Sequence, residues 1–214
     1  MNIRLLIAAA VAAAATGSVA NAVQVSPVSY SFDQPNSCGS FCYVDTTPPS
    51  KLTDGVVGVA GWATNSGSEW DGWLYKPVVN IDFNFGAATS ISSVSIGSTQ
   101  DDLNDVVLPS YNVFSSSNGV TWTFVQGLVV PPSTANNNNP YSTAPHSFFT
   151  LSGLGINAQY VRVSTVANGP WTFIDEVRFE GSTVPEPQSW ALMMVGFGLV
   201  GATLRRRKLV SVTA

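Results

Sequence analysis

Aromatic side chains gather in one short stretch of this 214-residue chain: Trp62, Trp70, Trp73 and Tyr75 lie close together among glycine and serine residues. Aromatic faces exposed on loops can stack on sugar rings while polar neighbours bind the hydroxyl groups. Trp62, Trp70 and Tyr75 are therefore candidate ligand-binding residues. The alternative is that the rings fill the core, which we expect for Trp73 and for Trp122.

Two cysteines, Cys38 and Cys42, lie four positions apart. If the chain is exported to an oxidising compartment, a disulfide that closes this short loop is favoured. Free thiols remain the alternative, because so tight a loop restricts disulfide geometry. A zinc site is a poor fit, since no further cysteine or histidine lies nearby.

The acidic side chains are concentrated in the central part of the chain. Residues 23–183 contain twelve acidic and four basic side chains, so this part has a net charge of −8, compared with −4 for the whole chain. Such a surface repels phosphate backbones, and we expect no nucleic-acid binding. The excess of carboxylates is compatible with calcium, which prefers oxygen ligands. We expect the acidic run Asp101, Asp102 and Asp105 to be a solvated turn.

Familiar catalytic motifs are missing from the sequence. It has no G-x-S-x-G, no H-E-x-x-H and no cysteine beside a histidine, and its one histidine, His146, follows a loop rich in serine and proline. We therefore expect a protein that is not an enzyme.

The central part reads as short strands separated by glycine, proline, asparagine and serine. Val79, Ile81, Phe83 and Phe85 alternate with polar residues, which predicts a strand with one buried face. Asn118-Gly119 predicts a tight hairpin turn. Further strands are expected near residues 94–96, 111–115, 121–126, 148–151, 160–165 and 173–179. Seven or more short strands predict an all-β fold, an antiparallel sandwich or jelly roll.

The N-terminus has the organisation of a signal peptide. Arg4 precedes an apolar stretch over residues 5–15, and Ala20-Asn21-Ala22 has small residues where a signal peptidase cuts. We expect a helical signal segment over residues 1–22 that signal peptidase removes.

The C-terminus has the organisation of a membrane anchor. An apolar stretch over residues 190–204 ends at the basic residues Arg205, Arg206 and Arg207. As a helix it would be about 22 Å long, short for a hydrocarbon core of about 30 Å. The basic residues predict a short transmembrane helix whose C-terminal end is cytoplasmic and whose preceding domain lies outside the cytoplasm.

Residues 184–214 as a whole resemble the PEP-CTERM sorting signal of Gram-negative bacteria, in its Pro-Glu-Pro-x-x-Trp-Ala form. The matching residues are Pro185, Glu186, Pro187, Trp190 and Ala191, followed by a methionine pair, several glycines and the basic cluster. The resemblance implies export, transient anchoring in the inner membrane, and processing near the Pro-Glu-Pro by an exosortase-type enzyme. The product would then reach the cell surface or the medium.

Residues 30–181, within the expected domain 23–183, resemble the discoidin, or coagulation-factor type C, domain of the galactose-binding-like superfamily. The similarity rests on five segments in order: 51–55, 78–86, 111–122, 160–163 and 176–181. It implies an eight-stranded jelly roll whose first and last strands bring the chain ends together. It also implies a domain type that often binds sugars.

The same resemblance implies a structural calcium site. Asp54 and Glu176 would supply carboxylates, and main-chain oxygens of the turn that begins at Lys51 would supply further ligands. A cation would offset the repulsion between the two carboxylates. The alternative is that Asp54 caps a turn and Glu176 pairs with an arginine such as Arg162.

The sequence therefore predicts a signal peptide (1–22), a discoidin-like domain (23–183) and a sorting signal (184–214). We expect an exported protein that binds carbohydrate, such as exopolysaccharide, or another matrix component. The alternatives are a purely structural matrix or biofilm protein that binds no free sugar and, third, a polysaccharide hydrolase.

Overall fold

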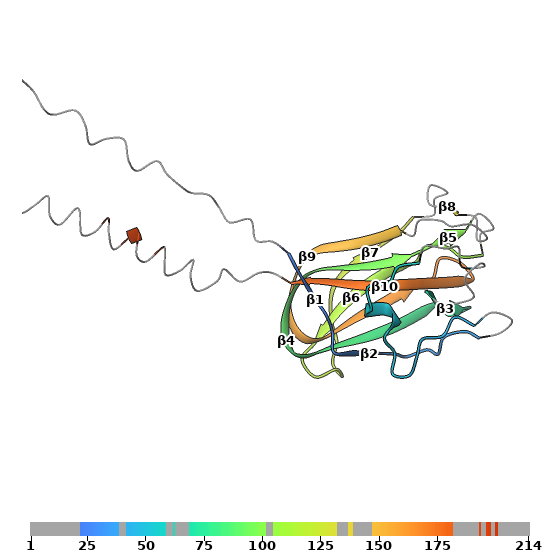
Figure 1. Cartoon of the computed structure of the whole chain (residues 1–214), viewed down its shortest axis with the longest axis horizontal. Coiled ribbons are helices and arrows are strands. Elements are labelled where there is room, and N and C mark those ends of the chain that lie inside the picture. Colours follow the sequence, from blue (N-terminus) through green and yellow to red (C-terminus); the bar gives the residue numbers. More distant parts are fainter. Residues whose placement is uncertain are drawn as a thin grey trace, which may run out of the picture. The chain divides into compact units, whose positions relative to one another are not determined.

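The computed structural model describes residues 22–38, 42–58, 62, 69–101, 105–131, 137–138 and 147–181, with isolated helical positions at 193, 196, 197 and 200. Figure 1 shows the chain. In chain order the elements are β1 (Val23–Val25), β2 (Ser29–Phe32), the 3₁₀ helix η1 (Lys51–Thr53), β3 (Asp71–Leu74), β4 (Val78–Ser98), β5 (Gln100–Asp101), β6 (Ser110–Ser116), β7 (Thr123–Leu128), β8 (Asn137–Asn138), β9 (Ser147–Val166) and β10 (Trp171–Gly181).

Two long antiparallel strands, β4 and β9, build both layers of the domain. The first half of β4 pairs with the second half of β9, and the second half of β4 pairs with the first half of β9. In β4 the pairing is interrupted between Asn84 and Thr89, where Gly86 has a φ angle of 75°. In β9 the register shifts between Ser152 and Ile156, where Gly153 has a φ angle of 73°. Residues other than glycine rarely adopt these φ angles. Each strand thus passes from one sheet into the other.

The pairings define two sheets. The first sheet has the order β2–β4–β9–β6–β7, and the second contains β10 with the other halves of β4 and β9. Strands β1 and β3 extend the second sheet along β10. This arrangement confirms the predicted all-β sandwich.

One end of the domain contains the paired first and last strands, and the other end contains connecting loops. Val23 of β1 pairs with Gly181 of β10, so the first and last strands lie side by side, as the resemblance implied. Figure 1 shows β1 at one end and β3, β5 and β8 at the other. The loops that join β3 to β4 and β9 to β10 lie at this second end, which we call the loop end.

Alternating side chains of the two sheets form the main core. Val79, Ile81, Phe83 and Phe85 are buried, and the polar residues between them are partly exposed, which confirms the predicted pattern. Fully burying one such side chain contributes about 1.5–3 kcal/mol. A second, smaller core lies apart from this one and consists of Tyr43, Trp70, Val106 and Phe173, with Trp62 and Trp171 partly buried against it.

The turn between β6 and β7 has the predicted asparagine–glycine geometry. Gly119 has a φ angle of 70°, and Asn118 Oδ1 accepts hydrogen bonds from the N–H groups of Val120 and Thr121, both at 2.9 Å. The Asn118 side-chain oxygen thus provides an acceptor for two backbone N–H groups that have no strand partner in the turn. This turn lies at the same end of the domain as β1.

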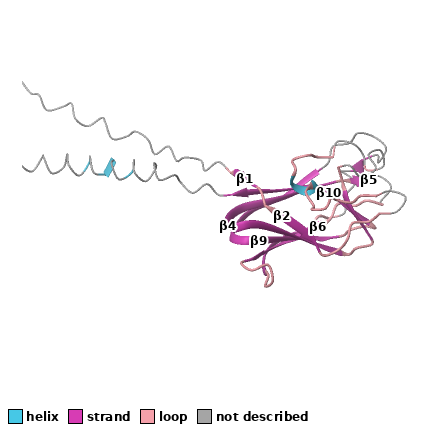
Figure 2. Ribbon diagram, turned by 60° about the horizontal axis from the view of Figure 1, so that its bottom comes forward, coloured by secondary structure: helices cyan, strands magenta, loops and turns pink. Residues whose placement is uncertain are grey.

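Helical structure plays a small part in the residues that the structure describes. Figure 2 shows the short helix η1 lying against β10. Within the described part of the chain, no helix combines the length and apolar character needed to cross a membrane. The predicted signal segment, residues 1–22, and the predicted transmembrane segment, residues 190–204, lie almost wholly outside the described residues.

Candidate functional site

Two short loops meet at the loop end and form a groove. The N–H of Tyr75 donates to Pro170 O at 2.8 Å, and the N–H of Ala167 donates to Pro77 O at 3.0 Å. These bonds hold the β3–β4 and β9–β10 loops side by side. The groove between them, here called the loop-end groove, has a volume of about 410 Å³ and is lined by Tyr75, Lys76, Pro77, Ala167, Asn168 and Gly169.

Tyr75 is the most exposed aromatic residue of this groove and has an unusual backbone. Its side chain is 76% exposed, and its φ angle is +52°, in the left-handed region that residues other than glycine rarely adopt. Such a conformation persists where the surrounding structure imposes it, and it is found often at functional sites. Of the three predicted ligand-binding aromatics, Tyr75 is the one with an open ring.

The polar side chain of Asn168 is held firmly in the loop-end groove. Its Nδ2 donates to Leu108 O at 2.8 Å and to Val130 O at 3.2 Å, and it lies 3.3 Å from Ser110 Oγ. These bonds fix the amide orientation. Among the described residues, none donates a hydrogen bond to Asn168 Oδ1, so this oxygen is available as an acceptor.

Trp70 is a correction to the sequence interpretation. It is 1% exposed and belongs to the second core, where its ring contacts Phe173. The backbone of Gly58 lies so close to the indole that an added Cβ would be 2.2 Å from Trp70 Cζ2. Because the ring is enclosed on these sides, Trp70 cannot offer a face to a ligand.

Trp62 is only partly open. Its ring stacks on Phe173 with a centroid distance of 5.8 Å and an interplanar angle of 16°, and its Nε1 donates to Asp101 Oδ2 at 3.2 Å. Asp101 is buried, so the expected solvated acidic turn is wrong for this residue. Trp62 therefore helps to cover the second core, and the face that contacts Phe173 is closed to a ligand.

The predicted acidic pair comes together where the turn after η1 meets β10. Glu176 is buried, and its Oε2 accepts a hydrogen bond from Gly55 N at 3.1 Å. The neighbouring Asp175 is also buried, and its Oδ2 accepts from Gly58 N at 2.7 Å. Asp54 is exposed, and its Oδ1 accepts from Val56 N at 2.8 Å, the turn-capping role that we considered as an alternative.

Burial makes these carboxylates unusually weak acids. Desolvation raises the pKa of Asp175 to about 7, against the opposing effect of the Gly58 hydrogen bond. It also raises the pKa of Glu176 to about 7, and the nearby charges of Asp54 and Asp175 add to that rise. Arg162 does not pair with Glu176: it binds Asp82 instead, at 2.6 Å.

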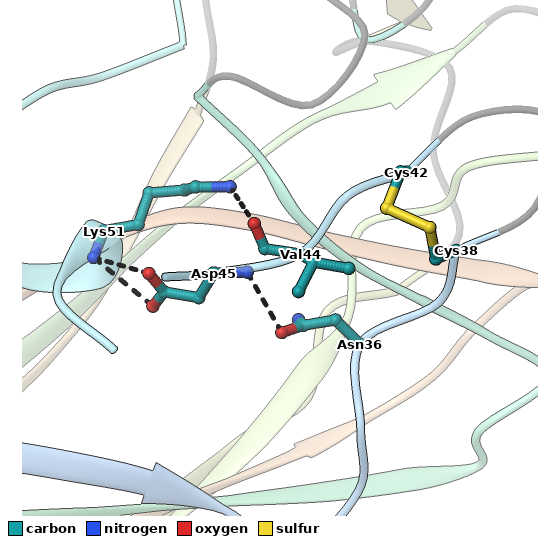
Figure 3. Close-up of a disulfide and its surroundings, with 6 residues drawn as sticks. All are labelled: Asn36, Cys38, Cys42, Val44, Asp45 and Lys51. Atoms are coloured by element: carbon teal, nitrogen blue, oxygen red, sulfur yellow. Dashed lines mark hydrogen bonds between the residues drawn. A yellow bond between two sulfur atoms is a disulfide. The ribbon is translucent and has the colours of Figure 1, made fainter. Parts of the chain in front are cut away.

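Lys51 lies beside this turn, but its side chain is used elsewhere. Its Nζ donates to Val44 O at 3.0 Å and Trp70 O at 3.1 Å, and lies 3.2 Å from Asp71 Oδ1. Figure 3 shows the Nζ directed at Val44 O and the main-chain N directed at the carboxylate of Asp45. The side chain of Lys51 is therefore committed to these partners and supplies no ligand to a metal.

The predicted disulfide between Cys38 and Cys42 is present (Figure 3). It closes a five-residue loop directly before Tyr43, whose fully buried ring packs on Phe173 with a centroid distance of 4.5 Å. The crosslink therefore restricts the segment that delivers Tyr43 to the second core.

Residues 35–177 of the sequence match the F5/8 type C domain. This match covers more than half of the chain. The chain belongs to the F5/8 type C domain family. The result confirms the predicted family over most of the expected range, and the β-sandwich agrees with it.

Solved structures share the fold of this F5/8 type C domain. A pectin-binding carbohydrate-binding module is similar with a TM-score of 0.50 and 13% identity, over 76% of this chain and 96% of that chain. The C-terminal domain of a chitobiase from Bacteroides fragilis has a TM-score of 0.50 and 12% identity, over 76% of this chain and 100% of that one. At such low identity the likeness shows the fold alone. A comparison with curated proteins finds no match.

The C-terminal sorting signal is also confirmed by comparison. Residues 183–208 match the PEP-CTERM protein-sorting motif, which marks this F5/8 type C protein for export toward the cell surface. The motif residues lie outside the described residues of the structure, and these are Pro185, Glu186, Pro187, Trp190, Ala191, Arg205, Arg206 and Arg207.

The acidic pair of this F5/8 type C domain has the chemistry that a calcium ion needs. Asp54 and Glu176 bring two carboxylates to one turn. Burial is the main cause of the raised pKa of Glu176, and the charge of Asp54 adds to the rise, so a cation beside the two carboxylates would favour the ionised form of Glu176. In the described residues no group of three or more acidic, cysteine or histidine side chains forms a complete metal site. A calcium ion here would therefore depend on main-chain oxygens of the turn for its remaining ligands.

Proposed function

We propose that this protein is an exported carbohydrate-binding protein and that the loop-end groove receives a sugar residue. The observation that carries the proposal is the Tyr75 ring, which is 76% exposed and belongs to the lining of a 410 Å³ groove. The Tyr75 backbone is held there by the hydrogen bond to Pro170 O. A flat aromatic face packs against the apolar face of a pyranose ring, and few side chains provide such a face at so small a loss of conformational freedom.

Polar groups of the same groove would set the orientation of the sugar. Asn168 Oδ1 accepts a hydrogen bond from a hydroxyl group, and the ammonium of Lys76 donates one. Among the described residues that line the groove, no carboxylate or nucleophile accompanies these two groups. We therefore propose a binding protein and not an enzyme.

Calcium, where bound, supplies positive charge between Asp54 and Glu176. Asp54 and Glu176 would hold it together with main-chain oxygens of residues 51–55. The role of calcium in this proposal is structural. The ion would join the turn after η1 to β10, and the same segment continues to Gly58, which contacts Trp70 of the second core. The carboxylates belong to the scaffold that supports the loop end and not to the groove itself.

The sorting signal supports a route for the protein. We propose that signal peptidase cuts after Ala22, that the basic C-terminal end holds the chain in the inner membrane with its domain in the periplasm, and that an exosortase-type enzyme processes residues 185–187. The domain then reaches the surface or matrix, where exopolysaccharide is a ligand of suitable chemistry. The intact mass of the secreted protein measures both cleavages.

Binding is tested on a glycan array with the secreted protein in calcium buffer. We expect wild type and Phe124→Ala to bind the same neutral glycans, and Tyr75→Ala to lose at least tenfold in affinity. Phe124 is a matched control because it is also an exposed aromatic residue, 58% exposed, on β7 and outside the groove. A blank array for wild type would favour a purely structural matrix protein. Release of reducing ends from the array glycans would instead show a hydrolase.

A further inference from the structure

A second groove lies on the outer face of the first sheet, near the end of the domain that contains β1. It has a volume of about 260 Å³, and we call it the outer-face groove. The side chains that matter for its chemistry are Ser29, Ser31, Asp82, Asn84, Trp122 and Tyr160. None of these belongs to the loop-end groove.

Strand register places these side chains in two adjacent rows. Ser29 pairs with Asn84, which pairs with Tyr160, and this is the first row. The second row is formed by Ser31, Asp82 and Arg162 in the same way. Residues between the rows point into the core, so both rows face outward. Three neighbouring strands thus present a polar and aromatic surface about 10 Å across.

Trp122 is held in place by a fixed cation. Arg162 donates to both oxygens of Asp82, from Nε at 2.6 Å and from Nη2 at 2.8 Å. Its guanidinium lies over the Trp122 ring, 4.2 Å from the centroid. A bidentate ion pair combined with a cation–π contact restrains the indole before any ligand arrives. This result corrects the expectation that Trp122 lies in the core.

Asn84 directs a free donor into the groove. Its Oδ1 accepts hydrogen bonds from Gly86 N at 2.8 Å and from Gln159 Nε2 at 3.3 Å. These donors fix which side of the amide is oxygen. The Nδ2 group has no acceptor among the described residues, and the exposed hydroxyls of Ser29 and Ser31 have no partner in the same part of the structure.

We propose that the outer-face groove binds a second sugar residue, of the neutral pyranose class. This inference rests on the proposed carbohydrate binding. The Trp122 and Tyr160 rings supply apolar surface, and Asn84 Nδ2 and the serine hydroxyls supply hydrogen bonds. The Asp82 carboxylate in the groove and the acidic surface of the domain disfavour sugars that carry carboxylates or sulfates.

The two grooves lie at opposite ends of the halves of β4 and β9 that pair in the first sheet, Val78 to Asn84 and Tyr160 to Val166. The loop-end groove precedes Val78 and follows Val166, whereas the outer-face groove contains Asn84 and Tyr160. Four residues of β-strand, from Val78 to Asp82, separate the nearest parts of the two grooves, which corresponds to about 13 Å. One sugar residue cannot occupy both grooves, so a single domain holds two glycan segments, and it crosslinks them where they belong to different polysaccharide chains.

The inference is tested with the full chain in a zwitterionic detergent that has no sugar headgroup. The probes are the methyl glycosides of glucose, galactose and mannose, followed by calorimetric titration and ligand-observed NMR. Two variants alter the outer-face groove, Tyr160→Ala and Asn84→Asp. The second keeps the side-chain size and removes the Nδ2 donor, so that it separates loss of binding from loss of folding. Tyr75→Ala alters the loop-end groove, and Phe124→Ala is the control.

We expect wild type and the control to bind two equivalents of a neutral glycoside. Each outer-face variant lowers the affinity of one equivalent at least tenfold, about 1.4 kcal/mol, and leaves the other unchanged. Wild type aggregates beads coated with the corresponding polysaccharide, whereas variants of either groove bind the beads without aggregating them.

The outcomes separate this inference from the proposed function. If Tyr75→Ala abolishes all binding and the outer-face variants change nothing, the second site is excluded and the loop-end site stands. If the outer-face variants abolish all binding and Tyr75→Ala changes nothing, the outer-face site stands and the loop-end assignment is excluded. If no probe binds wild type, both are excluded.

Discussion

The ammonium of Lys51 lies 3.2 Å from the carboxylate of Asp71, whose side chain is fully buried. The contact joins the 3₁₀ helix η1 to strand β3, two elements with no shared backbone pairing. The same Nζ also binds two main-chain oxygens, so the ion pair is part of a network that closes this side of the second core.

Removing Lys51 should destabilise the domain strongly. Lys51→Met leaves the Asp71 carboxylate buried without its cation, and breaking a buried pair in this way typically costs about 3–5 kcal/mol. The double variant Lys51→Met with Asp71→Asn should recover much of that loss, because no charge remains buried. Urea denaturation at pH 8 measures the free energies of unfolding.

Lys76→Met is the control for the ion pair. Lys76 forms no ion pair in the described structure, and its replacement should change the free energy of unfolding by less than about 0.5 kcal/mol. Equal losses for Lys51→Met and the double variant would show that the hydrogen bonds from Lys51 Nζ to Val44 O and Trp70 O, and not the uncompensated charge of Asp71, account for the loss.

Stability should fall as the pH rises from about 4.5 to 7. Burial raises the pKa of Asp71 to about 7, although Lys51 opposes the rise, and the pKa values of Asp175 and Glu176 are also about 7. The unfolded chain loses these protons near pH 4. Between the two values the folded state binds more protons, so each step up in pH favours unfolding.

The pH experiment is a series of urea unfolding curves in EDTA. Asp71→Asn should show a shallower fall than wild type, because it removes one of the three protons. The series stops at pH 4.5 so that Asp45 stays ionised throughout. Burial alone would raise the pKa of Asp45, but the hydrogen bonds that it accepts outweigh this effect and lower the pKa, so Asp45 loses its stabilising charge only in stronger acid. A stability that rises from pH 4.5 to 7 would contradict the buried, protonated carboxyls.

Much of the fold follows from local sequence patterns. The alternation around Val79 to Phe85 predicts which side chains are buried, because successive strand residues face opposite sides. The Asn118-Gly119 turn is set by backbone preferences that two residues alone specify. The pairing of Cys38 with Cys42 needs only the short distance between them.

Whether an individual tryptophan is buried or exposed depends on residues that are distant in the sequence. Trp70 is buried because Gly58 and Phe173 approach it. Trp122 lines the outer-face groove, where Arg162 of β9 covers its ring. These neighbours lie 12 to 103 positions away in the sequence, so no local pattern shows them. Both expectations failed for that reason.

The two grooves also depend on contacts between residues that are distant in the sequence. The rows of the outer-face groove exist only because β2, β4 and β9 pair in one register, and a shift by one residue would turn every member into the core. The sequence shows that Asp82 and Asn84 share a wet face, but it does not show that Ser31 and Tyr160 lie beside them.

Calcium should raise the stability of the wild-type protein. A ligand present at one hundred times its dissociation constant adds about 2.7 kcal/mol to the free energy of unfolding. We expect 1 mM calcium to raise the unfolding midpoint and EDTA to reverse the effect. Glu176→Gln should abolish the shift because it removes one of the two carboxylates.

Glu180→Gln is the matched control for calcium, since Glu180 lies on the same strand and is exposed. Its hydrogen bond from Ser93 Oγ does not involve the turn after η1. An unfolding midpoint that is the same in calcium and in EDTA for wild type would exclude the site.

Tyr75→Gly should separate stability from ligand binding. A residue other than glycine held at positive φ costs about 1–3 kcal/mol, and glycine removes that strain while adding about 0.5–1 kcal/mol of unfolded-state entropy. We therefore expect Tyr75→Gly to be at least as stable as wild type, and Tyr75→Ala to be no more stable than wild type, because alanine retains the strain. Both should lose the loop-end sugar site, as thermal unfolding and glycoside titration will measure. A marked loss of stability in Tyr75→Gly would mean that the Tyr75 ring supports the fold, and its exposure would then no longer argue for a binding role.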